Sequence, residues 1–106
     1  MRTAARRDDN HADIVAGLRK CGYSVLDLGA VGKGCPDILV GVTCHGMKHN
    51  MLMEIKDGEK CLSAQKLTDA QVGWFQTWKG QACVVNSIDQ ALAAIADKKL
   101  ETPGGF

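Results

Sequence analysis

Two apolar segments, ILVGV at 38–42 and MLMEIK at 51–56, constrain the fold of this chain more than any other feature. Each has the length of a β-strand and is rich in aliphatic side chains, which favours a buried strand. The stretch between them, 45–50, is polar and contains Gly46, as turns commonly do. We therefore predict that residues 38–56 fold as a β-hairpin.

The segment that precedes the hairpin predicts one helix and one strand. Asn10 suits a helix N-cap, apolar residues follow it at helical spacing, and Gly22 ends the helix. A short strand is expected at 23–28, before the glycine-rich loop at 29–34. The chain therefore enters the hairpin through a helix, a strand and a loop.

Two capping boxes after the hairpin predict two further helices. Thr68-x-x-Gln71 opens the first of these helices and Ser87-x-x-Gln90 opens the second. Apolar residues at 82–85, between the helices, predict a fourth strand. Because a helical crossover joins the third strand to the fourth, these two strands should be parallel. The expected fold is α/β, with a mixed four-stranded sheet flanked by helices in the order αβββαβα.

Length and composition favour one globular domain. The chain has 106 residues, of which 45% are hydrophobic and 24% are charged, a balance typical of a folded domain. We expect a single domain over 1–106, with a core at about 10–96 and flexible tails at 1–9 and 98–106. No apolar run approaches the roughly 20 residues of a membrane helix, and the start, MRTAARRDDN, lacks the apolar stretch of a secretory signal. These observations favour a cytoplasmic protein with no membrane partner.

The cysteines favour reduced thiols over a disulfide scaffold or a zinc site. Their number is odd, five, and no CxxC pair occurs. Zinc could be imagined between Cys35, Cys44, His45 and His49, but the spacing does not match a zinc finger. Adjacent residues of an extended chain, such as Cys44 and His45, also point to opposite sides. We therefore do not expect zinc.

Three charged residues interrupt the apolar pattern of the hairpin: Asp37, Glu54 and Lys56. Glu54 and Lys56 lie two residues apart on a strand, so their side chains point to the same face. Asp37 stands at the start of the partner strand, where the turn can bring it close to Glu54. Two neighbouring carboxylates repel each other unless a cation lies between them, and Mg²⁺ or Mn²⁺ prefers oxygen ligands. The pattern predicts a metal site with a lysine beside it.

Such a set of residues suits metal-assisted cleavage of a phosphodiester bond. The metal would polarise the phosphate and lower the pKa of an attacking water, and Lys56 would position that water or stabilise the developing charge. Gln71 could add a hydrogen bond to the water or to the metal shell. Plainer interpretations exist for each residue alone. Asp37 can cap a turn, Gln71 already belongs to a capping box, and Glu54 can form an ordinary ion pair with Lys56.

The same motifs carry a resemblance to a known family. Pro36-Asp37 followed by Glu54-Ile55-Lys56 resembles the PD-(D/E)xK nuclease superfamily. The wider match of GCPDILVG, MLMEIKDGEK and LSAQKLTDAQ is similar to its VRR-NUC branch, in the compact form found in phages and prophages. The resemblance covers about 10–95 and implies a restriction-endonuclease-like fold.

The resemblance also implies roles for individual residues. It implies metal ligation by Asp37, by Glu54 and by the backbone carbonyl of Ile55. It implies that Lys56 is the catalytic lysine and that Gln71 is the catalytic glutamine borne by a helix.

One departure from the superfamily concerns the first helix. Members often carry a glutamate there that helps to hold the metal, and this chain has no glutamate in that helix. Asp13 or His11 falls in the same neighbourhood. Asp13 is the better Mg²⁺ ligand by chemistry, although its side chain is shorter.

The resemblance implies a structure-selective DNA endonuclease that acts on branched DNA, such as Holliday junctions, as a homodimer. A two-fold dimer supplies two active sites for two strands. A rival interpretation is a non-catalytic nucleic-acid-binding or assembly protein on the same fold; the intact charged residues of the hairpin argue against it. The helix expected after Thr68 has an apolar face that is larger than the packing of one small helix requires. This face could pack in the core or form a dimer contact, and it comprises Trp74, Phe75 and Trp78.

Basic residues give only a weak indication of where DNA would lie. The net charge is +1, so the distribution of charge matters more than its sum. Lys60 and Lys66 follow the third strand, and Arg6 and Arg7 lie near the N-terminus. We expect these four residues to contact nucleic acid, with solvated surface charge as the plainer alternative.

Overall fold

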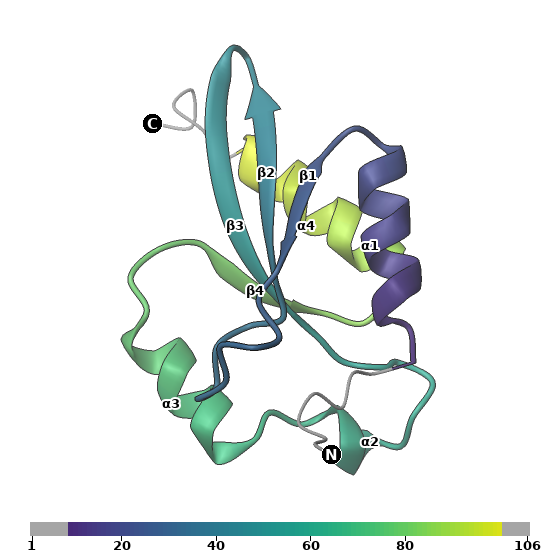
Figure 1. Ribbon diagram of the computed structural model, residues 1–106, viewed down its shortest axis with the longest axis vertical. Helices are drawn as coiled ribbons and strands as arrows, with labels where there is room; N and C mark the ends of the chain where they lie inside the picture. The colour runs from purple at the N-terminus through teal and green to yellow at the C-terminus, as the bar shows by residue number, and fades with distance from the viewer. Residues whose placement is uncertain (1–8, 101–106) are drawn as a thin grey trace.

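The computed structural model describes residues 9–100, with side chains described as far as residue 97, and it has the predicted α/β architecture (Figure 1). Arg6, Arg7 and the segments 1–8 and 101–106 lie outside the described residues. The elements in chain order are α1 (His11–Lys20), β1 (Ser24–Asp27), β2 (Ile38–Cys44), β3 (Met47–Ile55), α2 (Leu62–Gln65), α3 (Asp69–Thr77), β4 (Ala82–Val85) and α4 (Ile88–Leu100).

The sheet has four strands in the order β1-β2-β3-β4. β1 pairs antiparallel with β2, and β2 pairs antiparallel with β3, whereas β3 and β4 are parallel. The predicted mixed sheet, the hairpin and the parallel crossover are therefore confirmed. The order of elements differs in one respect, because the short helix α2 lies in a segment that was predicted as a loop.

The hairpin turn is tighter than predicted. Cys44 pairs with Met47, so only His45 and Gly46 form the turn, with φ of 53° and 78°. Positive φ at both central residues is the geometry of a type I′ turn, which matches the twist of the strands it joins. β3 therefore begins at Met47, and the prediction of a turn over 45–50 was wrong. Strand pairing needs backbone hydrogen bonds but not burial, so these largely exposed polar residues extend the strand instead.

One face of the sheet carries the hydrophobic core. Alternate residues of β2 and β3 point to this face and pack against residues of α1 and α4. Gly17 lets the two helices approach closely, because a Cβ at this position would lie 2.8 Å from Cδ1 of Ile88. The buried core residues are Ile14, Leu18, Ile38, Val40, Val42, Met51, Met53, Ile55, Val85, Ala91 and Ile95.

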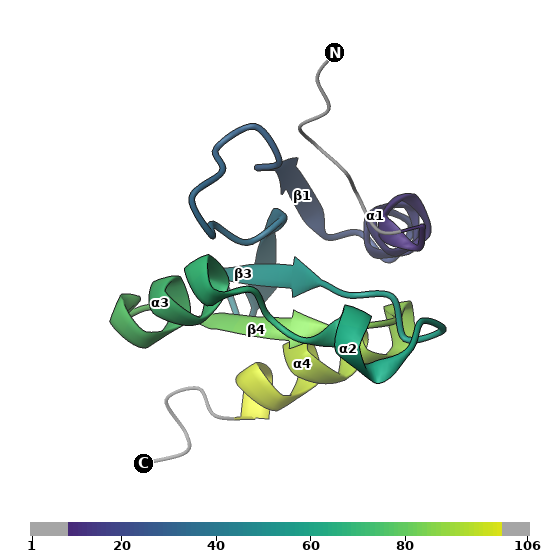
Figure 2. The ribbon, with the colours of Figure 1, turned by 90° about the horizontal axis from the view of Figure 1, so that it is seen from below.

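The opposite face of the sheet carries the charged residues of the hairpin. Leu39, Leu52 and Glu54 alternate with core residues, so they point away from α1 and α4. The loop between β1 and β2 lies beside α3 (Figure 2). Together, this loop and α3 enclose the end of the hairpin at which β2 begins and β3 ends.

The predicted helix caps are partly confirmed. Thr68 and Gln71 form both hydrogen bonds of a capping box at the start of α3. At the start of α4, the Ser87 hydroxyl accepts from the Gln90 amide, but the Gln90 side chain accepts from the amide of Asn86 rather than from that of Ser87. α4 continues to Leu100, so 98–100 are helical rather than part of a tail.

Asn10 has a different role from the predicted one. It occupies the N-cap position of α1, but its side chain makes no capping hydrogen bond. Its Nδ2 instead donates to the carbonyl oxygens of Lys56 and Asn86, at 3.2 and 2.9 Å. Asn10 therefore joins the start of α1 to the ends of β3 and β4.

Two further findings concern the described part of the chain. All five cysteines lie in it, and each is a free thiol. No helix within residues 9–100 combines the length and the apolar character that crossing a membrane requires.

Candidate active site

The hairpin places Asp37 beside the end of β3. Ile38 pairs with Met53, so Asp37 and Glu54 occupy the next positions of the same antiparallel register. Oδ2 of Asp37 accepts a hydrogen bond from the amide of Ile55 at 2.7 Å. The side chain of Asp37 therefore continues the ladder where backbone pairing stops, which fixes it next to the strand that carries Glu54.

Glu54 and Lys56 are buried charged residues. Their exposed fractions are 3% and 9%, and Nζ of Lys56 lies 3.8 Å from Oε2 of Glu54. Removing charges from water is costly unless they are paired and hydrogen-bonded. β3 ends at Ile55, so Lys56 directly follows the strand rather than belonging to it, but the predicted closeness of Lys56 to Glu54 is confirmed. The cost of burial indicates that this arrangement needs support from other residues.

Gln71 supplies that support by joining the two charged residues. Its Nε2 donates to Oε2 of Glu54 at 2.8 Å, and its Oε1 accepts from Nζ of Lys56 at 3.0 Å. The same oxygen accepts from the amide of Thr68 at 2.9 Å in the capping box. One amide group thus fills the predicted role of Gln71 in the helix cap and also joins the two charged residues. The predicted bond of Gln71 to a water or a metal shell stays a prediction.

Gly34 brings α3 to this position. It has φ of +81°, and an added Cβ would lie 2.6 Å from the carbonyl carbon of Ala70 and 3.1 Å from the amide nitrogen of Gln71. Real Cβ atoms do not approach backbone atoms so closely. Both the positive φ and this close approach therefore require glycine at position 34. The glycine-rich loop therefore packs directly against the first turn of α3 and sets the position of Gln71.

Cys35 lies within the electrostatic field of the two carboxylates. Burial raises the pKa of its thiol, and the negative charges of Glu54 and Asp37 raise this pKa further. Both carboxylates therefore contribute negative potential to the same small region, just before the first residue of β2. Negative potential of this kind favours a cation.

The donor set fits a hard divalent cation. Asp37 and Glu54 offer carboxylate oxygens, and Mg²⁺ is commonly held by one or two carboxylates while it keeps several waters. Among the described residues, no three His, Cys, Asp or Glu side chains form a complete metal-binding group. The protein's share of a Mg²⁺ shell would therefore be these two carboxylates and the carbonyl of Ile55, with water as the remainder.

His11 lies across the sheet from these carboxylates. It is buried, and its Nε2 lies 3.5 Å from Oδ2 of Asp27. Asp27 pairs with Ile38, whose side chain belongs to the core face. The contact of His11 is therefore on the side of α1 and α4, whereas Glu54 points to the other side.

Asp13, the second candidate on the first helix, is exposed and lines a separate cavity of about 390 Å³. Asp57 and Glu59 line this cavity as well, but Asp37 and Glu54 are absent from the described residues around it. The structure thus brings neither candidate of the first helix to the paired carboxylates.

The predicted DNA-contacting lysines lie on the surface that follows β3. Lys60 is partly exposed, with Nζ 3.9 Å from Oδ2 of the exposed Asp9. Lys66 is exposed at the C-terminal end of α2. Neither position conflicts with a contact to a large ligand, and the other two predicted residues, Arg6 and Arg7, lie outside the described part of the chain.

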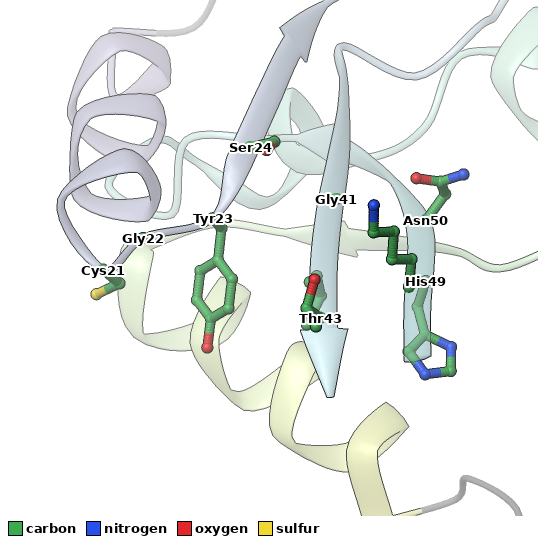
Figure 3. A pocket seen from close by; sticks show the side chains of 10 residues that line it. Cys21, Gly22, Tyr23, Ser24, Gly41, Thr43, His49 and Asn50 are labelled. Atoms are coloured by element: carbon green, nitrogen blue, oxygen red, sulfur yellow. The ribbon is translucent and has the colours of Figure 1, made fainter. Parts of the chain in front are cut away.

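The four residues weighed as zinc ligands are spread along the hairpin. Cys35 precedes β2 and Cys44 ends it, and a seven-residue strand spans about 20 Å. His45 is exposed in the turn. His49 lines a cavity of about 630 Å³ near the hairpin tip, together with Thr43 (Figure 3). The active-site candidates are not among the residues that line this cavity.

Two residues near the candidate site, Cys35 and Asn10, were predicted from the sequence to have other roles. Cys35 was weighed as a zinc ligand, although its place two residues before Asp37 already indicated that it would lie near the carboxylates. Asn10 was interpreted as a cap. Its actual partners, Lys56 and Asn86, are 46 and 76 residues away in the chain, and no local pattern signals contacts of that kind.

The chain was compared with protein-family models, with curated proteins and with solved structures. No family model matches the chain, and neither a curated protein nor a solved structure matches it.

Proposed function

We propose that this chain is a Mg²⁺- or Mn²⁺-dependent endodeoxyribonuclease that hydrolyses phosphodiester bonds. The observation that carries the proposal is the convergence of Asp37, Glu54, Lys56 and Gln71 at one end of the hairpin. A structural ion pair needs one anion and one cation. A second carboxylate beside the pair, and an amide held between its members, have a use in binding a metal and a phosphate.

The residues would divide the work as follows. Asp37, Glu54 and the carbonyl of Ile55 would hold the metal, which when bound polarises a phosphate oxygen and lowers the pKa of water. Lys56 carries three N–H donors, of which one bonds to Gln71, so another can be directed at a phosphate oxygen or at the attacking water. Gln71 keeps the lysine and Glu54 at a fixed separation.

The substrate and assembly of the proposal follow the family resemblance. We propose branched DNA, such as a Holliday junction, as the substrate, and a homodimer on the restriction-endonuclease-like fold as the active form, in a bacterial or phage-infected cytoplasm. One chain of this size has one such site, and a two-fold dimer would present two of them to two strands.

The test is a cleavage assay on linear, nicked, flap and four-way DNA with Mg²⁺ or Mn²⁺. The wild type should cut at least one substrate, and Glu54→Gln and Asp37→Asn should each lower the rate by about 100-fold or more. These near-isosteric variants are preferable to alanine, because an alanine would also leave a charge or a cavity in a buried site. Glu59→Gln, which changes an exposed glutamate, is the matched control and should cut at the wild-type rate.

A second measurement tests metal binding without activity. Mg²⁺ or Mn²⁺ should raise the melting temperature of the wild type and of Glu59→Gln, because a ligand that binds only the folded state stabilises it. The same ions should not raise that of Asp37→Asn. Undiminished cleavage by Glu54→Gln would refute the proposal. Binding of DNA with no cleavage by the wild type would favour the rival interpretation, a non-catalytic nucleic-acid-binding or assembly protein.

A further inference from the structure

A small apolar pocket lies on the same sheet face as the proposed site. Leu39 and Leu52 pair directly across β2 and β3. Glu54 is two residues from Leu52 on β3, so Leu39, Leu52 and Glu54 point to one face. Asp37 directly precedes β2, two residues before Leu39. The pocket has a volume of about 370 Å³, and its lining consists of Leu39, Asn50, Leu52, Trp78, Gly80 and Gln81.

Trp78 forms a rigid aromatic wall of this pocket. Its ring stacks on that of Trp74, with centroids 4.9 Å apart and planes inclined by 16°. Gly80 lies against the indole, since a Cβ there would be 2.9 Å from Nε1 of Trp78. Even so, Trp78 remains 48% exposed. An aromatic ring that is held in place and still exposed is suited to stacking with another flat group.

The chemistry of the pocket excludes a phosphate and suits a nucleobase. Of the described residues that line it, all are apolar, glycine or amide side chains, and none carries a charge. A phosphate would lose its hydration there without gaining a cation. A base is uncharged, stacks on aromatic rings and has polar edges that the Asn50 amide can bond. The Gln81 side chain already donates its Nε2 to the Asn50 carbonyl oxygen at 2.7 Å, which leaves its Oε1 as an acceptor for such an edge.

Apolar side chains are also exposed beyond the pocket, on both edge strands of the sheet. Leu26 pairs with Leu39 and is 57% exposed. Val84, which is level with Glu54 in the parallel pair of β3 and β4, is 43% exposed. The surface beside the proposed site is therefore partly apolar. Such a surface suits contact with nucleobases better than contact with the charged backbone of a continuous duplex.

We infer that this pocket takes an unstacked nucleobase of the strand whose phosphate lies at Asp37 and Glu54, an inference that rests on the proposed function. Residues two apart on a strand are about 7 Å from each other, which is within the reach of one nucleotide. The substrate class is then DNA with an unpaired nucleotide next to the scissile phosphate, as at junction centres, flaps and single strands. Extruding a base from an intact duplex costs free energy that an unpaired base does not require, so duplex DNA is disfavoured.

The test measures binding in EDTA, where the proposed metal-dependent cleavage cannot occur. The probe is a single-stranded oligodeoxythymidylate that carries one 2-aminopurine, with a fully paired duplex of the same length as the comparison. The wild type should bind the single strand more tightly than the duplex and quench the 2-aminopurine. Trp78→Ala should weaken binding of the single strand about tenfold, the loss expected for one base–aromatic stack, and leave duplex binding unchanged. Trp78→Phe should retain most of the affinity.

Leu62→Ala is the matched control, because Leu62 is an exposed apolar residue, at 80%, on α2. This variant should bind both probes as the wild type does, and circular dichroism should show that each variant is folded. Equal affinity for single strand and duplex, or unchanged binding by Trp78→Ala, would overturn the inference. So would a sedimentation result in which Trp78→Ala converts a dimer to a monomer, because a second copy would then cover the pocket.

The two proposals fail in different ways. If the wild type cleaves DNA but Trp78 does not affect single-strand binding, the proposed function stands and the base pocket is wrong. If the wild type quenches the probe but cuts no DNA with Mg²⁺ or Mn²⁺, the pocket stands and the catalytic proposal is wrong.

Discussion

The two ends of the β2–β3 hairpin are built from the same two strands but in opposite ways. At the tip, Lys48 and Asn50 are exposed, and the turn is closed by two residues of positive φ. At the other end, Glu54 and Lys56 are almost fully buried and are bonded by a side chain from α3. The charges at the tip are solvated by water. The buried charges at the other end are stabilised instead by other side chains of the protein.

This difference indicates where the chain has accepted a cost in stability. Replacing a buried ion pair by apolar residues is often neutral or stabilising, so stability alone does not explain why the base of the hairpin holds Glu54, Lys56 and Asp37 together. Among the described residues, the tip contains no buried ion pair. The contrast between the two ends supports a functional use of the end that holds Glu54 and Lys56, and four pairs of measurements test it.

Two lysines, one at each end of the hairpin, should differ most in their contribution to the free energy of unfolding. Lys56→Ala should lower the free energy of unfolding by about 3–5 kcal/mol, because it leaves the buried Glu54 without its cation. Lys48→Ala, at the exposed tip, should change it by less than about 0.5 kcal/mol. Urea unfolding measures both values. Equal losses in the two variants would show that the two ends contribute equally to stability. The double variant Glu54→Gln with Lys56→Met, which removes both buried charges, should recover most of the stability lost in Lys56→Ala.

The second prediction compares two glycines of positive φ. Gly46→Ala at the tip meets no atom within 4 Å, so it should cost only the backbone strain of about 1 kcal/mol. Gly34→Ala adds a collision with Ala70 and should cost about 3 kcal/mol in total. Thermal or urea unfolding tests this ranking. A Gly34→Ala variant as stable as Gly46→Ala would mean that the loop can move away from α3.

The third prediction compares two helix caps of similar strength. Thr68→Ala and Ser87→Ala should each lower the free energy of unfolding by about 1 kcal/mol. Only Thr68→Ala should also slow cleavage, roughly tenfold, because Thr68 orients Gln71 in the proposed site. Parallel measurements of unfolding and of cleavage rate separate the two effects. A comparable loss of cleavage in Ser87→Ala would attribute the slowing to stability alone.

The smallest effect concerns two thiols. A hydrogen bond with the Ser63 hydroxyl lowers the pKa of the exposed Cys61, whereas burial, then Glu54 and Asp37, raise the pKa of Cys35. Because the thiolate is the reactive form, Cys61 should react faster than Cys35 with a thiol reagent near neutral pH, and the rate at Cys35 should begin to rise only at higher pH. Mass spectrometry of modified peptides over a pH series measures the order. Faster labelling of Cys35 would contradict the presence of a negative field from Glu54 and Asp37 at this thiol.

Much of the hairpin could be predicted from the sequence, because side-chain alternation has a fixed period. That period sufficed to place Glu54 and Lys56 on one face and Asp37 beside them. The turn could not be placed well, because the polar residues after His45 suit a loop and an exposed strand equally. The position of α3 depends on a contact between Gly34 and Ala70, which no pattern within either segment encodes.

The side chain of Asn10 bridges carbonyl groups from Lys56 and Asn86, and this bridge has a consequence for synthesis. During translation, the N-terminal part of the chain leaves the ribosome long before residue 86 has been made, so the bridge cannot close until almost the whole domain is available. Contacts of such large sequence separation form late, after their loop-closure entropy has been met. A nascent or truncated chain therefore lacks this restraint on the backbone of Lys56, and the complete arrangement around the lysine belongs only to the finished protein.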